Sequence, residues 1–267
     1  MKRRRVVAAT IALTCAVTCA CVRKKDPPWV SPPADAARGE PTLQGEPARI
    51  KRATAAPVID GKLDDAAWGS ATALGPLVKP GDGAEDHASP VDGFARMTWD
   101  DAKLYIAFVV KDGAAGSPFG RDDVDPHLWE KSSAVELMIQ PGDPGDNKGY
   151  YEIQIDVAGA VFDTRWDDYN TPIADGPDGK RFGHMDWSCK AERAVSRGDG
   201  RYYAVEIALP WSAFAGGRAA SPPKAGDVWR VNLYTFRDGQ RHALAWSPIR
   251  RQGNFHKASR FGRVRFE

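Results

Sequence analysis

The sequence predicts an all-β fold, an antiparallel β-sandwich of the jelly-roll kind with a few short helical turns. Short apolar runs rich in β-branched and aromatic residues recur along the chain, and clusters of Gly, Pro and Asp separate them. Several runs also alternate with a period of two, as half-buried strands do. With 267 residues, of which 42% are hydrophobic, the chain can bury a sizeable core, so we expect one folded domain.

The first residues have the pattern of a secretory signal. The basic stretch MKRRR precedes the apolar stretch VVAATIALTCAVTCAC, which is too short to span a membrane comfortably. We therefore expect residues 1–21 to be a signal peptide and the protein to be exported. The end of this stretch resembles the lipoprotein box of bacteria, in which small residues precede a lipidated cysteine.

Cys21, preceded by Ala20, is the best match to the lipidated position. This predicts a lipoprotein anchored at the outer membrane or cell surface, whereas a plain cleaved signal would give a periplasmic or secreted protein. Of the other cysteines only Cys189 would remain after cleavage, so no disulfide framework is expected. Cys189 is interpreted as a buried, inert thiol.

Residues 22–48 are rich in Pro, Ala and charged residues and have almost no apolar periodicity. This composition is typical of a linker, so the folded domain is predicted at residues 49–267. Across the chain 37 basic and 35 acidic residues are interspersed, and no basic patch indicates nucleic-acid binding. The sequence also lacks a Ser-His-Asp signature, zinc-ligand spacing and a phosphate-binding glycine loop.

The strand signals follow one another from residue 94 to residue 248. Nine segments are expected to form strands: FARMTWD, KLYIAFVVKD, SAVELMIQP, YYEIQIDVAG, AVFDTRW, CKAERAV, YYAVEIALP, VWRVNLYTF and ALAWSP. Residues 104–110, LYIAFVV, are apolar at every position, which predicts a strand covered on both faces. Helical turns are expected only at LDDAAWGSA and at PWSAFAG, where Pro210 would begin the turn.

Three of these strands are predicted to have one apolar and one polar face. In residues 134–140, Val135, Leu137 and Ile139 share the apolar face and Glu136 lies on the other. The same alternation in residues 150–157 and 228–236 leaves further polar side chains on a second face. If the three strands are neighbours, one patch would contain Glu136, Gln154, Asp156, Asn232 and Tyr234.

Such a patch suits a sugar, because carboxylates and amides bind hydroxyl groups and aromatic rings stack on the C–H faces. Trp129, just before its strand, and Phe255, in the late loop, could supply the rings, and the neighbouring His256 is a further candidate. Trp166 is a reserve candidate in what the sequence presents as a polar loop. The alternative is an ordinary solvated sheet face.

Seven blocks in order resemble the family 9 carbohydrate-binding modules: PVIDGKLDDAAW, ARMTWDDAKLYIAFVVKD, LWEKSSAVELMIQP, GYYEIQIDV, DGRYYAVEIALPWSAF, AGDVWRVNLYTF and AWSPIRRQGNFHKASRFGRVRF. The resemblance runs from Pro57 to the C-terminus. It implies a β-sandwich that holds a terminal sugar between two aromatic residues above a polar sheet. By position, Trp129 and Phe255 would be the aromatic pair, Glu136 the strand carboxylate, and Gln154, Asp156 and Tyr234 the hydrogen-bonding positions.

The resemblance also implies structural calcium and, as partner, a mono-, oligo- or polysaccharide. We expect the module to be held at the membrane by its lipid anchor and to hold a glycan there for a partner enzyme or transporter. Candidate calcium ligands are the carboxylates of Asp60, Asp64, Asp65 and Asp112. Asp is equally common in turns, where it binds backbone N–H groups, so these residues have a local alternative.

Three other functions stay open. A glycosidase could use Glu136 and Asp156 as its two carboxyl groups. A related function is that of an accessory part in glycoside hydrolysis. A haem domain would need His and Met ligands, for which His184 and Met185 are neighbours in the sequence. A surface scaffold or adhesion module without a small ligand predicts that Trp129 and Phe255 are both packed inside, whereas sugar binding predicts two exposed rings across a gap.

Overall fold

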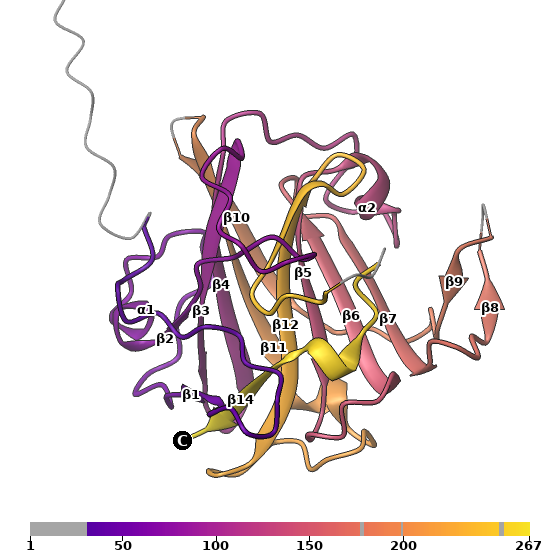
Figure 1. The fold of residues 1–267 in the computed structure, drawn as a ribbon. Helices are drawn as coiled ribbons and strands as arrows, with labels where there is room; N and C mark the ends of the chain where they lie inside the picture. The colour runs from indigo at the N-terminus through magenta and orange to yellow at the C-terminus, as the bar shows by residue number, and fades with distance from the viewer. Residues whose placement is uncertain (1–30, 177–178, 199, 251–253) are drawn as a thin grey trace, which may run out of the picture.

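The computed structural model describes residues 31–176, 179–198, 200–250 and 254–267. Two sheets pack face to face as a sandwich, and a small β-hairpin lies beside the larger sheet (Figure 1). The larger sheet contains β1 (Ala48–Ile50), β14 (Gly262–Phe266), β12 (Val228–Arg237), β5 (Ala134–Gln140), β6 (Lys148–Asp156) and β7 (Val161–Asp168), in this order, with β13 (Arg241–Ala245) also paired to β12.

The smaller sheet contains β10 (Glu192–Gly198), β11 (Tyr202–Pro210), β4 (Lys103–Asp112), β3 (Val91–Trp99) and β2 (Thr72–Leu74), in this order. The hairpin is formed by β8 (Ala174–Asp175) and β9 (Arg181–Phe182). Strand neighbours are antiparallel except β1 and β14, which run parallel. The prediction of an antiparallel β-sandwich is therefore confirmed.

The nine predicted strands correspond to β3–β7 and β10–β13. The strands that the sequence did not indicate have two to five residues each, which is too short to show a period of two. The helical turns expected near Trp68 and Trp211 are present as α1 (Ala66–Ser70) and η3 (Trp211–Phe214), and Pro210 precedes the second. Two further turns, α2 (Leu128–Lys131) and η4 (Ala258–Arg260), were not predicted.

The main core lies between the two sheets and contains the apolar sets that the period of two indicated. Val135, Leu137 and Ile139 of β5 are buried in it together with Trp229 and Val231 of β12. Burying such side chains stabilises the fold by about 1.5–3 kcal/mol each. The free thiol of Cys189 is also buried there, as predicted, and burial raises its pKa.

The strand predicted to be covered on both faces is β4, which lies between β11 and β3. Ile106 and Phe108 face the main core, whereas Tyr105 and Val109 pack on the outside against a cluster that includes Trp68 of α1. Within this outer cluster the buried Glu206 carboxylate accepts the Trp68 Nε1–H at 2.7 Å and the backbone N–H groups of Asp60 and Gly61 at 2.9 and 2.5 Å. Because these bonds satisfy a buried carboxylate, they hold the 60–68 segment on the sheet.

Part of the predicted linker packs against the sandwich. Trp246 Nε1–H donates to the Ala37 carbonyl at 2.7 Å, and Arg230 Nη1 donates to the Pro41 carbonyl at 3.0 Å. Arg263 Nη1 donates to the Thr42 and Gly45 carbonyls at 3.1 and 2.8 Å. The structure therefore places residues 37–45 in the folded unit, although their composition is typical of a linker.

Cys21 and the predicted signal peptide lie outside the described residues. Within the described ranges, every helix falls short of the length and apolarity needed to cross a membrane.

Candidate functional site

The polar face predicted for β5, β6 and β12 lies beneath the late loop, residues 254–261. Asn147, just before β6, holds this loop, because its Nδ2 donates to the His256 carbonyl at 2.9 Å and its Oδ1 accepts the Ala258 N–H at 2.7 Å. Apolar side chains of the loop, including Phe255 and Phe261, join Tyr150 and Tyr234 of the sheet in a second core. The face is therefore a covered layer, open only where a pocket remains.

That pocket has a volume of about 270 Å³. Its walls contain the aromatic rings of Trp129, Phe162, Tyr169, Phe182 and Phe255. Its floor contains the carboxylates of Glu136 and Glu152 and the amide of Gln154. Rings around a few convergent polar groups are the usual composition of a small-molecule site.

Trp129 forms one wall from α2 and is half-buried. Its ring stacks on His127, with centroids 4.6 Å apart, and meets Phe162 edge-on at 4.8 Å. These contacts fix the orientation of the indole while part of it stays open to the pocket.

Adjacent positions of β5 and β6 form the floor. Glu136 pairs with Gln154 across the two strands, so both side chains lie on the same face. Gln154 Nε2 donates to Glu136 Oε2 at 3.2 Å and to Glu152 Oε1 at 2.9 Å. Trp166 Nε1–H donates to Glu152 Oε2 at 3.0 Å. Gln154 Oε1 is buried and has no hydrogen-bond partner among the described residues.

Burial changes the protonation of these groups. It raises the pKa of Glu136 well above its ordinary value, and the neighbouring Glu152 carboxylate raises it further. Burial also raises the pKa of Glu152 to about 7, although the bonds from Trp166 and Gln154 oppose the rise. At neutral pH the Glu152 carboxyl group therefore lies close to titration, and burial favours the protonated form of Glu136.

His256 packs against the same floor. Burial lowers its pKa to about 3, so the imidazole is neutral at pH 7. Tyr150 Oη lies 2.7 Å from His256 Nδ1, and His256 Nε2 lies 3.7 Å from Glu152 Oε2. A Tyr150 hydroxyl that donates to Nδ1, with the imidazole proton on Nε2, fits both contacts.

Five of the eight predicted sugar contacts line the pocket: Trp129, Glu136, Gln154, Phe255 and His256. Phe255, however, does not stand free as the second exposed ring. Only 6% of it is accessible, and it lies on the Tyr234 ring. The reason is that the late loop packs down on the sheet, so the ring stabilises the loop as well as bordering the pocket.

The other three predicted contacts lie outside the pocket. Asp156 holds the turn after β6, because Oδ1 accepts the N–H groups of Ala158 and Ala160, both at 2.9 Å, and Oδ2 accepts the Ser132 hydroxyl at 3.1 Å. Asn232 Nδ2 donates to the Ser247 carbonyl at 2.9 Å and to Tyr234 Oη at 2.7 Å. Tyr234 is buried beneath the Phe255 ring. The hydrogen-bonding groups of Asp156, Asn232 and Tyr234 are thus already used within the protein.

The reserve candidate Trp166 is buried in β7 rather than exposed in a loop, and it serves the site by donating to Glu152. Sequence reasoning also passed over Glu152, which the period of two places on the face of Gln154. It gave no signal for Phe162, Tyr169 and Phe182, since these rings come from β7, the following loop and the β8–β9 hairpin. The described lining also contains Lys180, Arg181, Gln240 and Asn254, which were not predicted.

The candidate calcium ligands do not meet. Across the described residues no group of three or more Asp, Glu, His or Cys side chains could hold a metal. Asp60 Oδ2 pairs with Lys62 Nζ at 3.0 Å, Asp65 Oδ2 accepts the Val58 N–H at 2.9 Å, and Asp112 pairs with Arg237. The donor set of Asp60, Asp64, Asp65 and Asp112 therefore does not fit a calcium ion. The carboxylates of Asp60, Asp65 and Asp112 serve turns and ion pairs instead.

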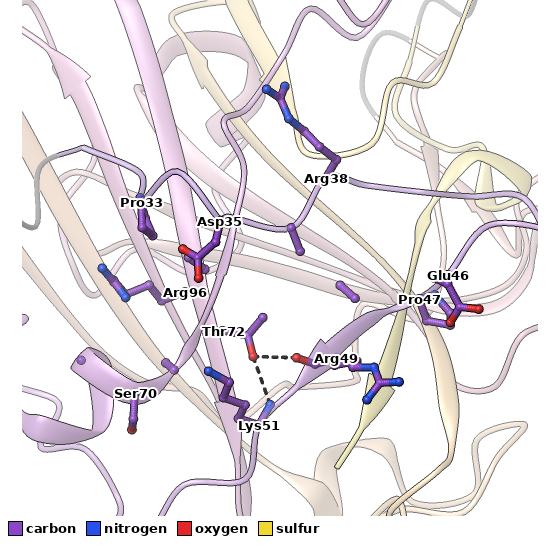
Figure 2. Close-up of a pocket in the computed structure, with 15 residues that line it drawn as sticks. Pro33, Asp35, Arg38, Glu46, Pro47, Arg49, Lys51, Ser70, Thr72 and Arg96 are labelled. Carbon is purple, nitrogen blue, oxygen red and sulfur yellow. Dashed lines mark hydrogen bonds between the residues drawn. The ribbon is translucent and has the colours of Figure 1, made fainter.

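A larger cavity, about 670 Å³, lies on another part of the molecule between residues 33–51 and the α1–β2 region (Figure 2). Arg38, Glu46, Arg49, Lys51 and Arg96 are spread around it rather than converging, and Thr72 Oγ1 is used by Arg49 and Lys51 backbone groups. The described part of its lining contains no aromatic ring on which a sugar could stack, so the smaller pocket is the better candidate.

A haem site is not favoured by the arrangement around His184. Its Nε2 lies 2.6 Å from Asp167 Oδ2, and the nearby Met185 packs with Leu128, Phe162 and Phe182.

Comparisons with known proteins agree with this fold. The model of the family described as carbohydrate family 9 binding domain-like matches residues 59–267. No curated protein matches the chain. A family 9 carbohydrate binding module from Caldicellulosiruptor kristjanssonii in complex with cellotriose is 16% identical with a TM-score of 0.56, and the match covers 82% of this chain and 93% of that one. The same comparison with a family 9 module of that organism in complex with glucose gives 16% identity, a TM-score of 0.55 and coverages of 82% and 95%.

Proposed function

Because the chain belongs to the carbohydrate family 9 binding domain-like family, we propose that it binds a sugar in the 270 Å³ pocket over β5 and β6. The observation that supports this most is the combination of walls and floor. Trp129 offers an oriented, partly open ring, and the Glu136 carboxylate below it can accept hydroxyl protons. Modules of similar fold have been solved with glucose and with cellotriose, which makes these the first ligands to test.

The proposed site binds a sugar but does not hydrolyse it. A glycosidase needs two carboxyl groups that flank the scissile bond. Of the pair considered from the sequence, Glu136 lies in the pocket, whereas Asp156 is bonded to the β6–β7 turn. Glu136 and Glu152 share one floor and are both bonded to the same Gln154 amide. Both carboxyl groups would thus contact one side of a bound sugar.

The proposed setting is the cell envelope. Export by residues 1–21 and lipidation at Cys21 would place the module at the outer membrane or cell surface. There it would hold a glycan for a partner enzyme or transporter.

The test is calorimetric titration of residues 22–267 with glucose, galactose, cellotriose and longer oligosaccharides, with tryptophan fluorescence as a second readout. Trp129→Ala should abolish binding and the ligand-induced change in fluorescence, because it removes the open wall. Glu136→Gln should weaken binding by about tenfold or more, since an oxygen acceptor of the floor is replaced by an amide N–H₂ donor.

Trp187→Phe is a matched control, because Trp187 is another partly buried indole that packs against the main core and does not line the pocket. It should leave binding unchanged. If no sugar binds while the wild type still melts cooperatively, the proposal is wrong and a scaffold without a small ligand becomes the better interpretation.

A further inference from the structure

The pocket floor has many hydrogen-bond acceptors and few free donors. Both donors of the Gln154 amide group lie on Nε2, and they are used by Glu136 and Glu152. Turning the amide would bring Oε1 against two carboxylates, so the present orientation is the favourable one. It leaves Gln154 Oε1 buried without a partner, and among the described residues Glu136 receives a hydrogen bond from Gln154 alone. When the two carboxyl groups are ionised, a ligand that fits this floor has to bring donors.

Among the described residues the floor has no positive charge to balance its two carboxylates. His256, the basic side chain beside Glu152, is neutral because burial lowers its pKa. The two cations in the described part of the lining, Lys180 and Arg181, are engaged at the rim. Lys180 Nζ lies 4.0 Å from Glu130 Oε1, and Arg181 Nη1 donates to the Tyr169 carbonyl at 3.0 Å while its guanidinium lies over the Tyr169 ring. Two buried carboxylates without a cation are costly when ionised, so a cationic ligand would be stabilised there.

We propose that the pocket takes a terminal amino sugar, whose ammonium group donates to Glu136 and to the unpaired Gln154 Oε1 while its ring lies against Trp129. This proposal rests on the proposed function, because it names the class of sugar bound at the same site. An ammonium group supplies three donors and one positive charge, which are the two properties that the floor lacks. Glu152 contributes the second negative charge at short range.

The walls argue for a sugar rather than a simple amine. The rings of Trp129, Phe162 and Phe182 enclose the space above the floor. A ligand without apolar C–H faces would gain little binding energy from contact with these rings. A small amine would therefore leave most of the pocket unfilled. Acetylation of the amine removes its charge and adds bulk at the floor, so the free amine is the expected form.

The experiment titrates residues 22–267 at pH 7 with glucosamine, glucose, N-acetylglucosamine and ethanolamine under identical salt. Glucosamine should bind about tenfold or more tightly than glucose, and N-acetylglucosamine and ethanolamine should bind more weakly than either. Glu136→Gln should reduce the preference for glucosamine over glucose. Glu46→Gln, which makes the same charge change at the other cavity, should leave the preference intact.

Each remaining outcome decides between the two proposals. Glucose binding equal to or tighter than glucosamine binding would overturn the amino-sugar inference and leave the proposed function standing. Ethanolamine binding as tightly as glucosamine would overturn it as well, because the ring would then contribute nothing. If none of the four compounds binds a cooperatively melting wild type and the neutral oligosaccharides also fail, both proposals are wrong. If a Gln variant melts early, the wild-type preference among the four compounds still decides the question.

Discussion

The rings of Phe255 and Tyr234 lie 4.1 Å apart between centroids, with their planes only 3° from parallel. Tyr234 belongs to β12 and Phe255 to the late loop, so this stack fastens the loop over the sheet. The Tyr234 hydroxyl adds a hydrogen bond to the Phe255 carbonyl at 3.3 Å. One aromatic pair thus both shapes a pocket wall and closes the second core.

Phe255→Ala should therefore lower the free energy of unfolding by about 3–5 kcal/mol, as expected for deletion of a buried aromatic side chain. Sugar binding should fall with it, since the loop also positions His256. Chemical denaturation and calorimetric titration measure the two effects. Phe255→Leu should recover much of the stability but little of the affinity, and an Ala variant as stable as wild type would show that the stack does not hold the loop.

Stability should depend on pH through Glu152. Its pKa in the folded protein is about 7, above the ordinary value of 4.5, so the protonated form favours folding. This contribution to the free energy of unfolding is complete below about pH 4.5 and is lost as the pH rises through about 7. The Glu152→Gln variant should show a flatter dependence of stability on pH between these two values. The titratable groups around Glu152 are Glu136 on β5, Tyr150 on β6 and Tyr234 on β12. Three basic side chains also lie around it on the late loop and the hairpin: His256, Lys180 and Arg181.

Thermal melts from pH 4 to pH 8 check this expectation. His256 acts in the opposite sense, because its lowered pKa removes stability as the pH falls from its ordinary value of 6.5 towards about 3. The difference between wild type and Glu152→Gln isolates the carboxyl contribution. A difference that does not change across the window would contradict the raised pKa.

Trp166→Phe should raise the pKa of Glu152 further, because the Nε1–H bond favours the ionised carboxylate. The cost in stability should be about 1–3 kcal/mol for a buried group that loses its partner. Carboxyl chemical shifts followed by NMR over pH give the pKa. Trp229→Phe is the control, because the Trp229 indole is buried and its Nε1 has no partner among the described residues, so the Glu152 pKa should not move.

A protein that begins at residue 48 should be less stable than one that begins at residue 31. The shorter chain loses the carbonyl acceptors of Ala37, Pro41, Thr42 and Gly45, which bind the side chains of Trp246, Arg230 and Arg263. At roughly 1 kcal/mol for each hydrogen bond, the loss should be several kcal/mol. Comparing the two denaturation curves tests this. Identical curves would show that residues 31–47 do not stabilise the domain and belong to the linker.

Asp112→Asn should destabilise the protein by about 3–5 kcal/mol, because it leaves the Arg237 guanidinium without its buried carboxylate. The loss should be the same in calcium and in EDTA, since the Asp112 carboxylate pairs with an arginine. A loss seen only with calcium present would identify Asp112 as a metal ligand. Whether the protein binds structural calcium stays a prediction, for which a wild-type melt with EDTA is the test.

Alternation along β5, β6 and β12 determined which side chains face the core and which share the second face, because strand side chains have a period of two regardless of the surroundings. The same reasoning correctly predicted that β4 is covered on both faces. It could not tell Gln154, which lines the pocket, from Asp156, two residues later on the same face. That difference depends on the turn after β6, whose backbone N–H groups bind the Asp156 carboxylate.

The tertiary structure alone decided what covers the second face. The late loop brings Phe255 and His256 onto the sheet, and the β8–β9 hairpin brings Phe182 beside Trp129, from positions distant in the chain. Long-range packing of this kind leaves no local pattern in the sequence, since each loop residue takes its neighbours from another element. The chain's own periodicity thus determined the sandwich and its faces, whereas the pocket, its paired glutamates and their raised pKa values arise from burial that only the folded protein creates.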